Sequence, residues 1–484
     1  MRKILGLLFL LTGCFRPHYD PQPVDLPTEW RLQADEGSTL CNFRWWEQFQ
    51  DPVLNQLVLT ALKNNQDLHV AIARVYDYYG RLGIVNSNLY PALYGNGSYN
   101  RAETSLNIPV GLTPGVGRIN NDFQAFFNLS WQLDFWGRYR SASDAAYAQL
   151  LTQIEARRAV VMTVVSAVAD AYIVLRQLDM QLDISKQTVA SRQYFLKLAQ
   201  DRFELGETSE MEVMQAAAEV ESTKIRLIEF ELAMSLQENL LSVIVGENPY
   251  AIERGVTIDL FKYPVTIPTG LPSDLLVRRP DIMGAEDNLI AANALVTEAR
   301  TLYFPQFQLT GAYGNESDML KNFLTAPSRM WQEGFSAVQT LFDAGKISYQ
   351  VDSAIAQRDE ALFIYRQTIL TALKEVDDGL ISYQKNKELA EEHRIQVAVL
   401  AKYLELAVLR YNEGETDYLN VLDAERTLFA AQLAFVQAQS DSFTAVVELY
   451  NALGGGWVID ADAMATTLNA AEVEIGNGLL EHIL

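Results

Sequence analysis

The chain has 484 residues, of which 49% are apolar and 20% charged, and its formal net charge is −23. This apolar content excludes a wholly disordered chain, and two cysteines exclude both a disulfide framework and a four-cysteine zinc site. A pI near 4.6 disfavours nucleic acid as a partner. No run approaches the ~18 to 20 unbroken apolar residues of a membrane helix, which excludes a polytopic helical membrane protein but leaves a β-barrel possible.

The N-terminus is typical of a bacterial secretion signal. A basic start, Met1-Arg2-Lys3, precedes an apolar run over 4–11 and the sequence Leu11-Thr12-Gly13-Cys14. This ending resembles a lipoprotein signal, so we expect residues 1–13 to be removed and Cys14 to carry lipid, including palmitate. The alternative is an ordinary signal cut elsewhere. With Cys14 acylated, Cys41 has no partner, and we expect a buried free thiol there.

Glycine and proline positions indicate a tandem duplication. Residues 138–205 and 207–245 contain neither residue type, and 346–413 (apart from Gly379) and 415–453 repeat the pattern. The boundary glycines recur at an offset of 208 residues. We therefore divide the chain into an N-terminal segment 14–50, a first repeat 51–245, a linker 246–272, a second repeat 273–454 and a tail 455–484.

The long runs predict helices. Apolar side chains recur every three or four residues, for example at Ile225, Ile228, Leu232 and Leu236. A helix over 138–205 is roughly 100 Å long, which favours coiled-coil packing over a compact core. Gly206 and Gly414 lie where the chain must reverse, so each long run forms a hairpin with the shorter run that follows it.

Short alternating segments predict four strands. Residues 128–135 alternate polar and apolar side chains just before the first long helix, and 335–342 occupy the same place in the second half. Residues 94–101 and 307–313 supply their partners, in hairpins about 90–136 and 304–343. The loop 106–118 is rich in Gly and Pro, and 315–332 is polar enough for a short helix. Four strands cannot close a barrel and an open edge cannot exist in lipid, so we expect three chains to share twelve strands.

Four ordered segments resemble the TolC-like outer-membrane factors, and more closely the OprM-like efflux lipoproteins. They are Trp45 to Leu54 with Ala61 to Leu68, Trp131 to Arg138, Leu276 to Glu286, and Tyr418 to Arg426. The resemblance implies a mainly α fold with a membrane β-barrel, in which a homotrimeric α-helical barrel joins a shared twelve-stranded β-barrel. It implies a passive outer-membrane channel with a periplasmic tunnel, whose partners are a periplasmic adaptor (membrane fusion) protein, an inner-membrane proton-driven pump and outer-membrane lipid.

The same resemblance implies a gate at the periplasmic tip. Its Leu-x3-Asp-x2-Arg spacing matches Leu419, Asp423 and Arg426, which share one helix face. Leu419 would narrow the aperture, Asp423 would form a ring of three carboxylates, and Arg426 would brace the closed state by pairing. The alternative is a solvated face with an internal Asp–Arg pair. The first-half counterparts at the same offset are uncharged: Met211, Gln215 and Ala218.

The two hairpin turns are acidic. Residues 198–221 and 406–426 together carry −9 of the −25 expected after signal removal, which favours an electronegative tunnel mouth and cation selectivity. By resemblance the turns contact the adaptor, through Leu205, Gly206 and Thr208 and through Gly414, Glu415 and Thr416. Glu207 and Glu415 stand where a small apolar residue is more usual. Both glycines also fit a C-cap role.

The family motif Arg278-Arg279-Pro280-Asp281 is interpreted as structural rather than as a ligand site. Pro280 suits the first position of a helix, and Asp281 suits the positive end of its dipole. Four scattered histidines and the lack of any nucleotide or nucleophile motif speak against catalysis, and we expect no cofactor beyond the lipid on Cys14. Two rival functions stay open: a channel for type I protein secretion, and a structural coiled-coil envelope lipoprotein without a pore.

Overall fold

The computed structural model describes residues 19–20, 23, 26–27, 30–31, 44–103, 105, 119–262 and 272–469. The signal segment, Cys14, Cys41, the loop 106–118, part of the linker and the tail beyond residue 469 lie outside the described residues. In chain order the elements are η1 (Trp45–Phe49), α2 (Pro52–Asn64), α3 (Gln66–Ser87), β1 (Ala92–Glu103), β2 (Ile119–Leu133), α4 (Arg138–Glu204), α5 (Glu210–Val245), η2 (Ile258–Leu260), η3 (Pro272–Val277), α6 (Pro280–Thr301), β3 (Gln306–Ser317), η4 (Leu320–Asn322), η5 (Ala326–Ser328), β4 (Arg329–Val338), α7 (Lys346–Asn412), α8 (Tyr418–Leu453) and α9 (Gly456–Asn469).

The chain separates into two compact units, each assembled from both halves of the sequence. The first contains the sheet, in Val75–Gln153 and Ala285–Tyr365. The second contains most of the helices, in Ile154–Gly284 and the described parts of Val24–Arg74 and Arg366–Leu484. The long helices α4 and α7 contribute to both units, so the unit boundaries do not follow the sequence repeats.

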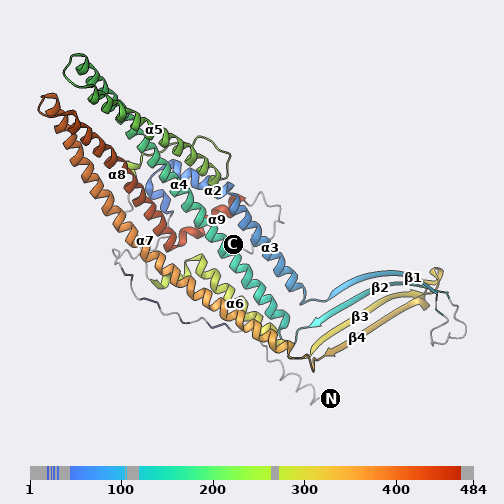
Figure 1. The fold of residues 1–484 in the computed structure, drawn as a ribbon. Helices are drawn as coiled ribbons and strands as arrows, with labels where there is room; N and C mark the ends of the chain where they lie inside the picture. The colour runs from blue at the N-terminus through green and yellow to red at the C-terminus, as the bar shows by residue number, and fades with distance from the viewer. Residues whose placement is uncertain are drawn as a thin grey trace. The chain divides into compact units, whose positions relative to one another are not determined.

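The first unit is built on a single antiparallel sheet in the order β1-β2-β3-β4 (Figure 1). Its two hairpins, β1–β2 and β3–β4, are joined because β2 pairs with β3. Most side chains along β1 and β4 are exposed on both faces. The sheet therefore has no core of its own, and its outer edges at β1 and β4 have no partner strand in the described chain.

Two strands lie earlier in the sequence than predicted. The strand expected over 335–342 spans Arg329–Val338, and that expected over 128–135 spans Ile119–Leu133. The partner strands set these limits. Val338 pairs with Gln306, the first residue after Pro305, and proline has no N–H to continue a ladder. The loop between β3 and β4 holds the 3₁₀ turns η4 and η5, in agreement with the short helix expected there.

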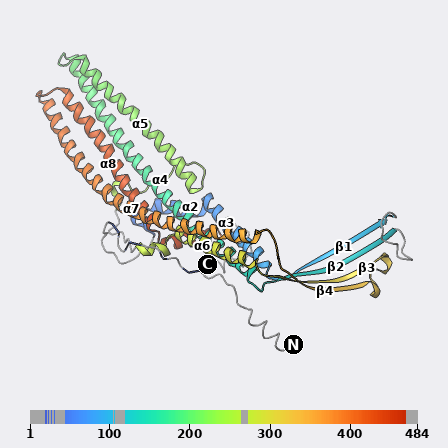
Figure 2. The same ribbon diagram turned by 60° about the horizontal axis from the view of Figure 1, so that its bottom comes forward.

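The second unit is built on two helical hairpins that lie side by side, α4–α5 and α7–α8 (Figures 1 and 2). Both hairpin turns are closed in the same way. Gly206 and Gly414 adopt φ of 78° and 77°, and the next residue donates its N–H to the carbonyl five positions earlier, from Glu207 to Arg202 and from Glu415 to Arg410. No atom lies within 4 Å of a Cβ built on either glycine, so the left-handed backbone itself calls for glycine here.

The second helix of each hairpin begins three residues later than predicted. Helices expected from 207 and 415 start at Glu210 and Tyr418. The reason is local: after the left-handed glycine, the chain needs an extended residue before it can re-enter a helix, and Ser209 and Asp417 occupy that position.

One helix, α4, contains an 18-residue window apolar enough to cross a membrane by length and composition. However, 61% of that window is buried against the rest of the chain, as expected for the central helix of a packed bundle. Its Tyr172 donates a hydrogen bond to Asp51, whose other acceptor contacts are the N–H groups of Val53, Leu54 and Val256. Asp51 therefore ties α2 and the linker to α4.

Candidate functional site

The hairpin tips share one apolar core. Residues from all four long helices contribute to it: Phe195, Ala199, Val213, Ala216, Ala407, Tyr411, Tyr418, Val421, Leu422 and Ala424. This core brings the start of α8, where the sequence places the gate residues, against the start of α5. The two hairpins are thus packed together at their tips rather than splayed apart.

A buried ionic network crosses between the hairpins at Glu219 of α5. One carboxylate oxygen accepts from Arg192 of α4 at 2.8 Å, and the other accepts from Nε of Arg426 of α8 at 2.8 Å. The side chains of Arg192 and Glu219 are only 3% and 8% exposed. Arg192 also donates to the hydroxyl of Thr223 and to the backbone carbonyl of Glu219, whereas its Nε is buried without a hydrogen-bond partner. A buried carboxylate shared by two guanidinium groups fixes α8 relative to the first hairpin.

A second link joins the hairpins closer to the turns. The hydroxyl of Tyr411 donates to a carboxylate oxygen of Glu212 at 2.7 Å, and Thr208 donates to the other oxygen. Burial, followed by this carboxylate, raises the pKa of Tyr411 to about 12. The phenol therefore stays protonated and remains a donor at physiological pH.

The predicted gate residues lie together on one exposed face of α8. Leu419 is 59% exposed, and Asp423 and Arg426 are exposed as well, whereas the intervening Val421 and Leu422 are buried. The spacing argument thus places them correctly, but the pairing differs from the internal Asp–Arg pair considered above. Arg426 pairs with Glu219, and Asp423 makes no ion pair within the described part of the chain.

Sequence reasoning missed the partner of Arg426, which is Glu219, and the other residues that link the hairpins near the gate residues: Arg192, Glu212 and Tyr411. One signal was available, because Tyr411 aligns with Phe203 at the 208-residue offset and differs from it mainly by the hydroxyl. That hydroxyl is the group that bonds to Glu212. Nothing in the sequence links Arg426 to Glu219, which is 207 residues away.

The predicted adaptor-contact residues are all at the surface of the turns. Leu205 is 75% exposed, and Gly206, Gly414 and Glu415 are exposed as well. Thr208 and Thr416 are partly buried, because each is in a hydrogen bond with a residue of the following helix, Glu212 and Asn420 respectively. Each turn thus has a fixed backbone and a solvent-facing acidic rim, to which the first turn adds one apolar side chain, Leu205.

Arg279 of the Arg-Arg-Pro-Asp motif has a buried side chain with protein partners on every side. It donates to both oxygens of Asp281 at 3.0 and 2.7 Å, to Glu375 of α7 at 2.6 Å and to the carbonyl of Ala452 at the end of α8 at 2.9 Å. Pro280 is the first residue of α6. The motif therefore joins α6, α7 and α8, and the geometry agrees with the structural interpretation.

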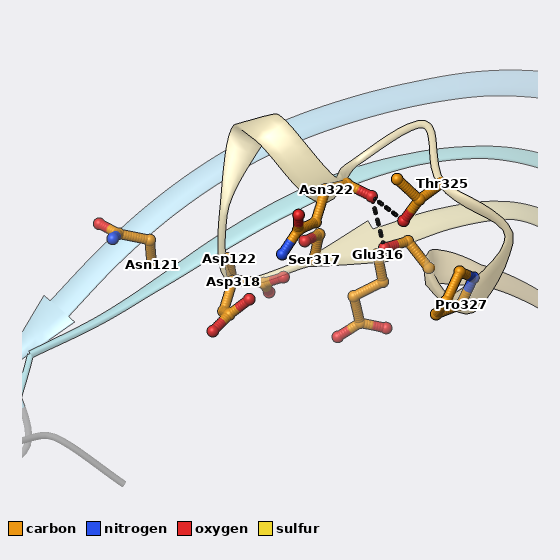
Figure 3. Close-up of a pocket in the computed structure, with 9 residues that line it drawn as sticks. Asn121, Asp122, Glu316, Ser317, Asp318, Asn322, Thr325 and Pro327 are labelled. Carbon is orange, nitrogen blue, oxygen red and sulfur yellow. Dashed lines mark hydrogen bonds between the residues drawn. The ribbon is translucent and has the colours of Figure 1, made fainter.

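A shallow pocket lies at the hairpin end of the sheet, beside η4 and η5 (Figure 3). Its acidic lining residues are Asp122, Glu316 and Asp318. Gln124 donates to Asp122 at 2.7 Å, and in Figure 3 the Glu316 carboxylate is directed away from the Asn322–Thr325 loop. Across the described ranges no group of three or more His, Cys, Asp or Glu side chains is placed to hold a metal ion.

Comparison with known proteins identifies the family of this fold. The profile of the outer membrane efflux protein family matches residues 57–247 and 271–455. The toluene efflux pump outer membrane protein TtgF of Pseudomonas putida is 32% identical over 469 residues, which cover 94% of this chain and 96% of the relative. The cation efflux system protein CusC of Escherichia coli is 30% identical, over 92% of this chain and 96% of the relative.

The solved structures agree with the sequence relatives. The Campylobacter jejuni CmeC outer membrane channel superposes with a TM-score of 0.87 at 26% identity, covering 94% of this chain and 98% of that one. The resemblance to TolC-like factors is thereby confirmed. This chain belongs to the outer membrane efflux protein family, and it is an outer-membrane channel of an efflux system.

Proposed function

We propose that three copies of the chain form one passive exit channel, with a shared β-barrel and a helical tunnel. The observation that carries this proposal is the four-stranded sheet, whose edges at β1 and β4 have no partner strand among the residues that the structure describes. An open edge in lipid leaves backbone groups unsatisfied at a cost of several kcal/mol each, so β4 of one copy must pair with β1 of the next. Three copies supply twelve strands, enough for a barrel with a lumen.

The helical unit supports the same assembly. One face of α5 carries an apolar stripe whose members are 50–65% exposed in the single chain: Ile225, Ile228, Leu232, Leu236, Leu240 and Val243. Such a stripe on a long helix is typical of a subunit interface. The other side of the unit, α7, also exposes apolar side chains, among them Leu370, Leu389 and Val399. A head-to-tail contact of α5 with the next copy's α7 closes a ring.

Native mass spectrometry of the full-length protein in detergent tests this assembly. We expect a trimer for the wild type and for the control Glu231→Gln, which changes an exposed polar position next to the stripe. Leu232→Glu places charges inside the interface and should shift the protein to monomers. A wild-type protein that conducts as a monomer would contradict the proposal.

We infer that the exposed α8 face closes the tunnel tip. Leu419 and Asp423 would form successive rings around the axis, and the links from Arg426 to Glu219 and from Tyr411 to Glu212 would hold the closed arrangement. The double variant Asp423→Ala, Arg426→Ala should increase conductance in planar bilayers, and unchanged closure would count against this role. The acidic turns should make the channel cation-selective, so a measured preference for anions would argue against an electronegative mouth.

The partners and the lipid anchor are further parts of the proposal. The rim formed by Leu205, Gly206, Thr208 and Gly414, Glu415, Thr416 would contact a periplasmic adaptor, which couples the channel to an inner-membrane proton-driven pump. Cys14 would carry the lipid. Mass spectrometry of the mature protein should find an acylated Cys14, and Cys14→Ser should abolish labelling by radioactive palmitate.

The exported compounds are small molecules in this proposal. Relatives of similar identity bear the names of a toluene pump and a cation system, which indicates that the pump rather than the channel sets the substrate. A complementation experiment distinguishes efflux from type I protein secretion. Restored resistance to solvents or antibiotics in a strain lacking its own channel supports efflux, whereas restored secretion of a protein toxin alone would favour type I secretion.

A further inference from the structure

The exposed face of α8 that carries Asp423 continues along the helix, away from the hairpin turn, and the charged side chains on it beyond Arg426 are all acidic. Beyond Arg426, the charged residues of this helix are Asp441 and Glu448, and both are exposed. They follow Asp423 by 18 and 25 positions, which are close to whole numbers of helical turns, so the three carboxylates share one face. The residues between them on this face are small or neutral, such as Thr427, Ala430, Ala434 and Gln437.

The adjacent helix places one more acid beside this face. Asp170 is the single charged residue of α4 between Arg158 and Arg176. The two helices are in contact through hydrogen bonds from Gln177 to Gln437 at 2.6 Å and from Ser191 to Glu425 at 3.1 Å, and the reversed order of these pairs shows that they run antiparallel. Asp170 is partly buried, and its Oδ1 atom is buried without a hydrogen-bond partner.

Among the residues that the structure describes, none supplies a compensating cation to Asp170. On the α5 side, the neutral Gln237 donates to the carbonyl of Ala171. Asp51 is bonded to the neighbouring Tyr172, and Arg176 pairs with Asp179. The charged group that acts on Asp170 is Glu448, and burial together with this carboxylate raises the pKa of Asp170 to about 7. A carboxyl that neither caps a helix nor pairs with a cation lowers the stability of the fold, so packing does not account for it.

We propose that Asp170 and Glu448 form a second acidic level in the tunnel wall, farther from the hairpin turns than the gate. The charge of this level changes with periplasmic pH, and in its ionised form it favours the passage of cationic solutes. This inference rests on the proposed trimeric tunnel, because it requires the gate-bearing face of α8 to line the lumen. Three copies would place three titrating carboxyls at one height, and a ring of negative charge raises the local concentration of cations.

Bilayer recordings of the full-length wild-type protein in a KCl gradient test the proposal. The reversal potential gives the ratio of K⁺ to Cl⁻ permeability, measured from pH 5.5 to pH 8.5. Three charges at a lumen radius of ~10 Å, partly screened by salt, should raise this ratio by about two- to threefold as Asp170 ionises. Asp170→Asn should remove the pH-dependent step and leave the lower ratio at every pH.

Two further variants make the result specific. Glu448→Gln removes the neighbouring negative charge, so the rise of the permeability ratio should occur at lower pH. Because Glu448 is exposed, this substitution tests the inference even if Asp170→Asn impairs folding. Asp441→Asn is the matched control on the same face, and it should lower the ratio while keeping the step in place. If the ratio of K⁺ to Cl⁻ permeability of the wild type does not change with pH, or if its change persists in Asp170→Asn, the inference is overturned, while the proposal of a trimeric channel stands. A wild-type protein that forms no channel overturns both.

Discussion

Replacing Tyr411 by phenylalanine removes a single hydroxyl from the contact between the two hairpin tips. That hydroxyl donates to Glu212 at 2.7 Å from a buried ring. A hydrogen bond to a charged group contributes ~1.5–3 kcal/mol, and the lower end applies because Glu212 is only partly buried and keeps Thr208 as a donor. A loss of about 1.5 kcal/mol from the closed state shifts the closed-to-open ratio roughly tenfold per subunit.

If the three subunits open together, the losses add, and the ratio shifts by roughly a thousandfold. Open probability in planar bilayers measures this shift directly. Tyr403→Phe is the matched control, because it removes a hydroxyl from a more exposed tyrosine of the same helix. If Tyr411→Phe opens no more often than wild type and Tyr403→Phe, the Tyr411–Glu212 bond does not hold the tip closed.

Three more variants probe buried charge in the helical unit. Glu219→Gln leaves the buried guanidinium of Arg192 without its carboxylate, so urea unfolding should show a loss of about 3–5 kcal/mol, whereas the exposed Glu221→Gln should change stability little. Arg279→Lys keeps the charge but loses the paired bonds to Asp281, and a loss of roughly 2 kcal/mol is expected by the same method. The pKa of Asp170 is about 7 in the folded state against 3.8 unfolded, so the protonated form favours folding and wild-type stability falls as pH rises through this range. Asp170→Asn should therefore be the more stable protein at pH 8, by at most about 4 kcal/mol, with the difference vanishing near pH 4; a difference independent of pH would contradict this assignment.

Local features of the sequence were sufficient to predict the long helices, their C-terminal ends and the hairpin turns, whereas α5 and α8 begin three residues later than predicted. The long helices end within one residue of the predicted positions, at Glu204 and Asn412, because a glycine that adopts positive φ stops a helix wherever it stands. Apolar spacing likewise identified the α5 stripe, and the Leu-x3-Asp-x2-Arg spacing placed three residues on one exposed face of α8. Each of these follows from the period of a helix and from backbone preference, which act over a few residues.

Strand limits and charge partners required the folded chain. The end of β4 depends on where β3 begins after Pro305, and the start of β2 at Ile119 depends on its pairing with Glu103 at the end of β1, so alternation alone misplaced both strands. Arg426 finds Glu219 across 207 residues, and Arg279 finds Glu375 across 96. Such pairs depend on how far one helix is shifted along another and which way each face turns. That register is set by the packing of large side chains throughout the tip core, and no single segment of the sequence contains it.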